Sequence, residues 1–317
     1  MSDETTRIIE ASRDEIAPFI GSRREKRQPR KAGSKIARTI AFTSGKGGVG
    51  KTNLVANVAI CMAQAGKRVI ILDGDLGLAN IDVVFGIRPK HCIVDVLSGK
   101  KTIDEILIPG PKGVSIIPGG SGIKELAALT AKESQRFLSE MQFLEDRADY
   151  VLIDTGAGIS PGVIDFCLAA DEVAVVTNPE PTAMADAYGI IKVIGLARPE
   201  ARVGVLVNRA ENAAEGHDIF SRIHRVAREF MQFHVHDLGH VVQDKQMYLA
   251  VRQQTPLLLF APVSPAARCI RDLVHHQWGV GLAEPTGAEA TPEPAADAPS
   301  AEGFFSRLAR RLGGNAA

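Results

Sequence analysis

The chain has 317 residues, 45% of them hydrophobic, and its 37 Lys and Arg balance 37 Asp and Glu. This indicates a globular protein with a sizeable core, in which any attraction to lipid or nucleic acid must be local. The four cysteines lie far apart without CxxC spacing, which argues against a disulfide framework, a zinc site or an iron–sulfur cluster. Without an apolar signal segment or a stretch of about 18 apolar residues, we expect a cytoplasmic protein that is neither exported nor membrane-spanning.

The N-terminal segment is polar, and residues 22–38, SRREKRQPRKAGSKIAR, hold eight Lys or Arg against one Glu. Such a charge run is typical of a solvated linker, and the alternative is contact with acidic lipid, nucleic acid or a partner protein. We therefore expect residues 1–37 to form a flexible basic arm. Duplex DNA is kept as an alternative ligand of residues 23–38.

Short β-branched runs alternate with helical patterns from Arg38 onward. Near-continuous apolar strands separated by helices are typical of a parallel sheet that is buried on both faces. The strand runs are RTIAFTS, RVIILD, VSIIP, YVLID, EVAVV and RVGVLV, and helices are expected at 51–65, 121–128, 131–146, 160–169, 181–196, 214–232 and 264–278. This pattern predicts one α/β domain over residues 38–281, with a doubly wound, mostly parallel sheet flanked by helices.

A glycine-rich segment, GKGGVGKT, follows the first predicted strand and opens a helix. Its glycines allow backbone N–H groups to point at a β-phosphate, while Lys51 can reach the β and γ oxygens and the Thr52 hydroxyl suits Mg²⁺. In this context the motif predicts the nucleotide site of a P-loop NTPase. The expected nucleotide-binding residues of the loop are Gly45, Lys46, Gly47, Gly48, Val49, Gly50, Lys51, Thr52 and Asn53.

The loop contains a second lysine, Lys46, which lies too early to reach its own γ-phosphate easily. It can instead reach the nucleotide of a partner across a two-fold axis. GKGGVGKT resembles the deviant Walker A motif of the MinD/ParA ATPases, and the resemblance covers residues 38–281 and the C-terminal tail. It implies a slow, switch-type ATPase that binds ATP and Mg²⁺ and forms a homodimer around ATP. It also implies catalytic roles for Lys46, Lys51 and Asp75.

Two predicted strands end in acidic residues. Asp73 and Asp75 begin the segment DGDLGLANID, and Asp154 ends the strand of YVLIDTGAG in a Walker B pattern, where it would hold Mg²⁺ through water. The resemblance implies that Asp75 orients the attacking water and that Asp73 is a supporting carboxylate near the metal. The switch positions indicated by the glycine pattern and the resemblance are Asn80, Gly156 and Gly158.

Later strands end in amides and histidines. Asn208 in LVNR is the expected adenine contact, because an amide pairs with donor and acceptor edges, and the absence of NKxD favours ATP over GTP. Asn178 in TNPEPTAMADAY falls in a family segment near the base and the dimer interface; alone, either amide is an ordinary strand-end residue.

The histidines of HVHDLGH could suggest a metal, but no Cys joins them and the segment fits a late family strand.

Residues 302–314, EGFFSRLARRLGG, follow a Pro/Ala-rich linker at 282–301 and predict a short basic amphipathic helix. Such a helix forms when its apolar face is buried at an anionic membrane. The alternative is docking on the protein's own surface or in a partner groove. We expect residues 302–317 to target the inner face of the cell membrane reversibly, through Phe304, Phe305, Arg307, Leu308, Arg311 and Leu312.

Three segments resemble the FlhG (FleN, YlxH) branch, which regulates flagellar number and placement: Lys51-Thr52-Asn53, DLGLANID and IIPGGSG. The branch implies partners such as an FlhF-type GTPase, flagellar switch proteins or a transcription activator. However, residues 1–37 lack the DQAxxLR-like element that stimulates FlhF. A MinD-like division-site ATPase, a ParA-like DNA or cargo-positioning ATPase and a mainly non-enzymatic, nucleotide-gated binding partner remain alternatives.

Overall fold

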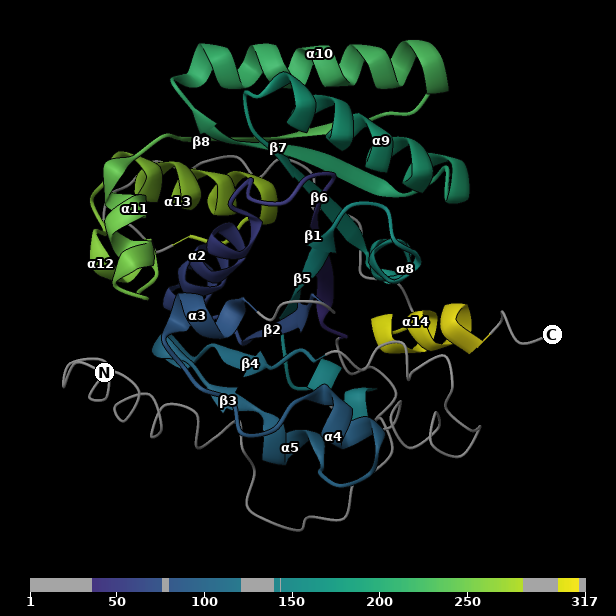
Figure 1. The fold of residues 1–317 in the computed structure, drawn as a ribbon, viewed down its shortest axis with the longest axis vertical. Helices are drawn as coiled ribbons and strands as arrows, with labels where there is room; N and C mark the ends of the chain where they lie inside the picture. The colour runs from purple at the N-terminus through teal and green to yellow at the C-terminus, as the bar shows by residue number, and fades with distance from the viewer. Residues whose placement is uncertain (1–35, 76–79, 121–139, 143, 282–301, 314–317) are drawn as a thin grey trace.

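The computed structural model describes residues 36–75, 80–120, 140–142, 144–281 and 302–313, and within them eight strands form one sheet (Figure 1). The strand order is β3-β4-β2-β5-β1-β6-β7-β8, and every neighbouring pair is parallel except β3 and β4. The strands are β1 (Arg38–Ser44), β2 (Val69–Gly74), β3 (Ile108–Pro109), β4 (Ser115–Ile117), β5 (Tyr150–Ala157), β6 (Glu172–Thr177), β7 (Arg202–Ala210) and β8 (His236–Val242). The predicted fold class is therefore confirmed.

Both faces of the sheet are buried because successive strand side chains point to opposite sides. In β5, Val151 and Ile153 join one apolar cluster while Leu152 joins the other. Helices α2 (Lys51–Gln64), α3 (Ile81–Phe85), α11 (Lys245–Arg252), α12 (Leu257–Phe260) and α13 (Pro265–Trp278) contribute to the cluster with Leu152. Helices α4 (Ile93–Leu97), α5 (Ile103–Ile106), α8 (Pro161–Ala169), α9 (Pro181–Ala197), α10 (Ala213–Met231) and α14 (Phe304–Gly313) contribute to the cluster with Val151.

The long helices lie where the sequence predicts them, with ends that differ by one or two residues. The predicted helix at 121–128 lies outside the described residues, as does most of 131–146. Short helices such as α3, α4, α5 and α12 were not predicted, because four or five residues are too few to show a helical period. Among the described residues, no helix combines the length and apolarity needed to cross a bilayer.

Candidate functional site

The phosphate loop connects the end of β1 to the start of α2. Its last residue, Gly50, caps the helix at φ 92°, in the left-handed region that favours glycine. A side chain on Gly47 would meet no atom of the described chain within 4 Å, so the loop faces open space at this point. The first N–H groups of a helix have no intrahelical partner and attract anions. The loop therefore has the form of a phosphate site.

Lys51 and Asp154 form a buried ion pair at the bottom of this loop. The Lys51 Nζ atom lies 2.5 Å from Asp154 Oδ1, and the two side chains are 8% and 0% exposed. Asp154 Oδ2 is also buried and has no hydrogen-bond partner among the described residues. An unsatisfied buried carboxylate oxygen requires an explanation, and a metal-bound water supplies one. The oxygen donors Thr52 and Asp154 thus fit Mg²⁺, which prefers oxygen ligands.

Asp73 lies beside Asp154 because β2 and β5 pair in register at these two residues. The Asp73 carboxylate accepts the N–H groups of Asp75 (3.1 Å) and Ile81 (3.4 Å). Burial, and then the negative charge of Asp154, raise the pKa of Asp73 to about 7. Asp73 thus organises the turn after β2 that carries Asp75.

Asp75 lies at the same sheet edge as the end of β5, which contains Gly156 and is followed by Gly158. A Cβ atom on Gly156 would lie 3.6 Å from Asp75 Oδ1, so the carboxylate lies against this glycine. Gly158 has φ 90° and donates its N–H to the Ser44 carbonyl at 2.8 Å, which ties the β5 end to the phosphate loop. Asn80 immediately precedes α3, and residues 76–79 lie outside the described residues. The structure thus brings Asp75, Gly156 and Gly158, three of the residues expected at the site, to the same edge as the phosphate loop.

Lys46 is held by its own chain. Its Nζ lies 2.7 Å from Glu180 Oε2 and 3.1 Å from Thr182 Oγ1, at the start of α9. The Asn178 amide donates to the other Glu180 oxygen at 3.1 Å. Lys46, and then Asn178, lower the pKa of Glu180. Sequence reasoning missed Glu180 and Thr182, although both lie in the segment TNPEPT; only the tertiary contact distinguishes them.

A cavity of about 1200 Å³ opens beside the loop and has room for a nucleoside. Asn208 lines it, but its Nδ2 atom donates to the Val49 carbonyl at 2.7 Å. Asn208 therefore fastens the phosphate loop, a role that the assignment to adenine did not include. Further residues of the cavity wall are Gly50, Asn53, Asn178, Glu180, Met247 and Tyr248.

The basic C-terminal helix α14 lies against α8 rather than apart from the protein (Figure 1). Its side chains Phe304, Phe305 and Leu308 are 0%, 2% and 3% exposed and belong to the core on that side of the sheet. The Phe304 ring stacks on Phe166 of α8, with 6.2 Å between centroids. The alternative of docking on the protein's own surface is what the structure shows; Leu312 lies beyond the described side chains.

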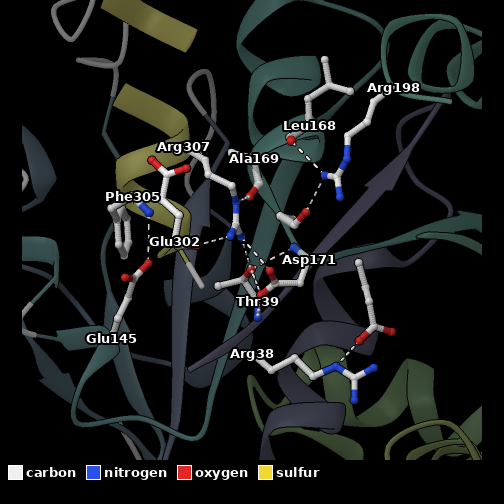
Figure 2. Close-up of polar contacts among 12 residues, drawn as sticks. Arg38, Thr39, Glu145, Leu168, Ala169, Asp171, Arg198, Glu302, Phe305 and Arg307 are labelled. Atoms are coloured by element: carbon white, nitrogen blue, oxygen red, sulfur yellow. Dashed lines mark hydrogen bonds and ion pairs between the residues drawn. The ribbon is translucent and has the colours of Figure 1, made fainter. Parts of the chain in front are cut away.

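The cations of α14 are paired as well, and Figure 2 shows the contacts of Arg307 with Asp171 and the Ala169 carbonyl. Arg307 contacts Asp171 Oδ1 at 2.8 Å and donates from Nε to the Ala169 carbonyl at 2.6 Å. Arg311 reaches Asp165 of α8 at 3.3 Å, and Arg310 pairs with Glu302. The docked helix therefore buries Phe304, Phe305 and Leu308, and each of these three arginines has an acidic partner.

The histidines near β8 include two whose rings are in contact. His236 begins β8 and His234 precedes it, with 4.7 Å between their ring centroids. Burial, and then the neighbouring His234, lower the pKa of His236. In the described part of the chain, no group of three or more His, Cys, Asp or Glu residues has the arrangement of a metal site.

Comparisons with known proteins agree with this arrangement. Residues 37–204 match the family model of an AAA domain. The chain is 37% identical over 228 residues to antiactivator FleN of Pseudomonas aeruginosa (72% of this chain, 81% of FleN), and 33% identical over 277 residues to the flagellum site-determining protein YlxH of Helicobacter pylori (86% and 90%).

Solved structures share the fold. MinD of Pyrococcus horikoshii with Mg-ADP has a TM-score of 0.62 and 24% identity, and covers 76% of this chain and 95% of its own. MinD in the MinC:MinD complex of Aquifex aeolicus has a TM-score of 0.61 and 25% identity, over 82% and 100%. The chain therefore belongs to the MinD/ParA family of ATPases, hydrolyses ATP, and within the family is most like FlhG/FleN.

Proposed function

We propose that this chain is a regulator of flagellar number or placement whose ATP-dependent dimer gates attachment to the inner face of the cell membrane. The observation that carries the membrane part is α14, an amphipathic helix whose Phe304, Phe305 and Leu308 are buried in the protein and whose three arginines are paired within it. While α14 is docked, its buried apolar side chains cannot insert into lipid, so membrane attachment requires release of the helix. Two tails released in one dimer would bind together with a high effective concentration.

The site residues support a switch driven by hydrolysis. Bound Mg²⁺ would neutralise charge on the β- and γ-phosphates, held by Thr52 and Asp154. Lys51 would contact the phosphates, Asp75 would orient the attacking water, and Lys46 would leave Glu180 to reach the partner's nucleotide. Lys46 and Lys51 each have to exchange a contact within the chain for one with nucleotide, which suits slow turnover and a change of state.

Helix α8 is the structural link between nucleotide and tail. It begins at Pro161, three residues after the switch glycine Gly158, and its Phe166 and Asp165 hold the tail. A shift of the Gly158 backbone toward a γ-phosphate would move the first turn of α8. Because a packed interface changes between discrete arrangements, a small shift is enough to release the tail.

The flagellar role rests on the relatives FleN and YlxH. Protein partners of the proposed dimer are flagellar switch proteins, a transcription activator or an FlhF-type GTPase. The alternative is MinD-like division-site positioning, since proteins named septum site-determining MinD are also related, at 35% identity over 178 residues for that of Synechocystis. Pull-down of purified candidate partners by the ATP-bound dimer would decide between these roles.

Co-sedimentation with anionic vesicles tests the membrane proposal. The proteins are the wild type, Lys46→Gln, which should not form the ATP dimer, and a chain that ends at Ala301. We expect pelleting only for the wild type and only with ATP. Pelleting with ADP, or pelleting of the chain without the tail, would contradict the proposal.

A further inference from the structure

The end of β7 has a backbone conformation that is unusual for the residue it carries. Arg209 has φ 59°, in the left-handed region that favours glycine. It is also the extra residue of a bulge, because its neighbours Asn208 and Ala210 pair with the successive β8 residues Val241 and Val242. Bulges beside binding sites serve to re-aim a side chain, and a strained residue at such a place points to a function.

The bulge places Arg209 in the wall of the nucleotide cavity. Arg209 follows Asn208, whose amide holds the Val49 carbonyl of the phosphate loop, and it lines the cavity together with Gly50 and Asn53. Because β7 lies two strands from β1 and neighbouring strands are about 4.8 Å apart, the end of β7 lies roughly 10 Å to the side of the start of the loop. The part of a nucleotide that extends beyond its phosphates would lie there.

The side chain of Arg209 is available to a ligand. It is exposed, and its guanidinium has no hydrogen-bond or ion-pair partner within the described part of the chain. Besides Lys46 and Asn178, the charge of Arg209 lowers the pKa of Glu180, so the guanidinium lies near this carboxylate, which lines the same cavity. Of the described residues that line the cavity, Arg209 is the only Lys or Arg.

We infer that Arg209 stacks its guanidinium on the face of the nucleotide base and takes the left-handed conformation to do so. The inference rests on the nucleotide site proposed at the phosphate loop and not on membrane attachment. A guanidinium is planar and weakly hydrated and stacks on aromatic faces, whereas a lysine ammonium is a strongly hydrated point charge. The apolar side chains of Met247 and Val251 line the same cavity and suit a flat, uncharged ring better than a further phosphate.

Binding of two probes to the full chain tests the inference. ATP carries the base, whereas ribose 5-triphosphate carries the same sugar and phosphates without it. Dissociation constants for both are measured by calorimetry with Mg²⁺ for the wild type, Arg209→Gly and Arg209→Lys, beside thermal unfolding without nucleotide. Glycine removes the side chain and the backbone strain together, and lysine keeps the charge without the plane. Arg225→Ala is the control, because Arg225 lines a separate groove on α10.

We expect Arg209→Gly to bind ATP roughly fivefold to tenfold more weakly than the wild type, and Arg209→Lys at least about threefold more weakly. Both should bind ribose 5-triphosphate within about twofold of the wild type, since its phosphates and sugar make no stacking contact. Arg209→Gly should unfold near the midpoint of the wild type, because relief of the left-handed backbone offsets the added freedom of glycine in the unfolded chain. Arg225→Ala should bind both probes like the wild type.

Three outcomes would overturn the inference. Equal weakening of both probes in Arg209→Gly would make Arg209 a phosphate or ribose contact. ATP binding by Arg209→Lys that matches the wild type would mean that charge, and not stacking, holds the nucleotide. ATP binding by Arg209→Gly that matches the wild type would mean that the side chain does not contact the nucleotide at all. If the wild type binds neither probe, the nucleotide site itself fails together with the inference.

Discussion

At the scale of single residues, the sequence identified the phosphate loop and its acidic partners because each follows a buried strand in a recognisable order. It did not identify the contacts these residues make with one another. The pairing of Lys46 with Glu180, and of Asn208 with the Val49 carbonyl, joins residues more than 130 positions apart. No local pattern encodes such contacts, since they depend on how β1, β6 and β7 lie side by side.

Asp154→Asn should destabilise the nucleotide-free protein. The substitution leaves Lys51 as an uncompensated charge that is 8% exposed, and breaking a buried pair costs about 3–5 kcal/mol. We expect the free energy of unfolding, measured by urea titration, to fall by about that amount. The double variant Lys51→Met with Asp154→Asn removes both charges and should recover part of the loss; equal stability of the single and double variants would show that the pair is not coupled.

Gly50→Ala and Gly47→Ala form a matched pair. Gly50 has φ 92°, and a Cβ atom there would lie 2.4 Å from Asn208 Nδ2, whereas a Cβ on Gly47 meets no described atom within 4 Å. We expect Gly50→Ala to lower the free energy of unfolding by about 1–3 kcal/mol, and Gly47→Ala by less than about 0.5 kcal/mol. Both should weaken ATP binding by calorimetry. Equal stability losses would contradict the assigned geometry.

At the scale of elements, the strands and long helices were predictable because their apolar patterns extend over many residues. The position of α14 was not. An amphipathic face can be buried by lipid or by a groove, and both give the same pattern of Phe, Leu and Arg. Whether α14 docks depends on the surface that receives it, which here includes Phe166, Asp165 and Asp171. The sequence around these three residues contains no pattern that marks them as a docking surface.

Asp171→Asn should weaken the docking of α14 on the rest of the protein. The Arg307–Asp171 pair is 16% and 12% exposed, whereas Arg311–Asp165 is 38% and 21% exposed, so the former is the more shielded contact. We expect Asp171→Asn to increase trypsin cleavage after Arg307 severalfold with ADP bound, and to allow vesicle binding without ATP. Asp165→Asn is the control and should change both measurements less. Cleavage that is unchanged in Asp171→Asn would mean that the apolar face alone holds the tail.

At the scale of the whole molecule, the two edges of the sheet carry different groups of residues. The phosphate loop, Asp75 and Asp154 lie at the carboxyl edge, and at the amino edge Glu172 contacts both Arg38 at the start of β1 and Trp278 at the end of α13. Helix α8 runs between the edges, with Pro161 near the first and Ala169 beside Arg307 at the second. A nucleotide signal thus has a direct route through one helix to the tail.

Hydrogen exchange can follow this route without a membrane. Asp75→Ala should bind ATP and hold the dimer, because it removes the proposed water-orienting carboxylate and leaves the phosphate loop intact. We expect the amides of residues 304–313 to exchange at least tenfold faster with ATP than with ADP, since release ends both the docking and the stability of so short a helix. Adding Lys46→Gln should restore slow exchange, and the amides of α10 should be unaffected throughout. If the dimer forms by light scattering while residues 304–313 stay protected, nucleotide does not control the tail, and lipid itself would have to draw it from α8.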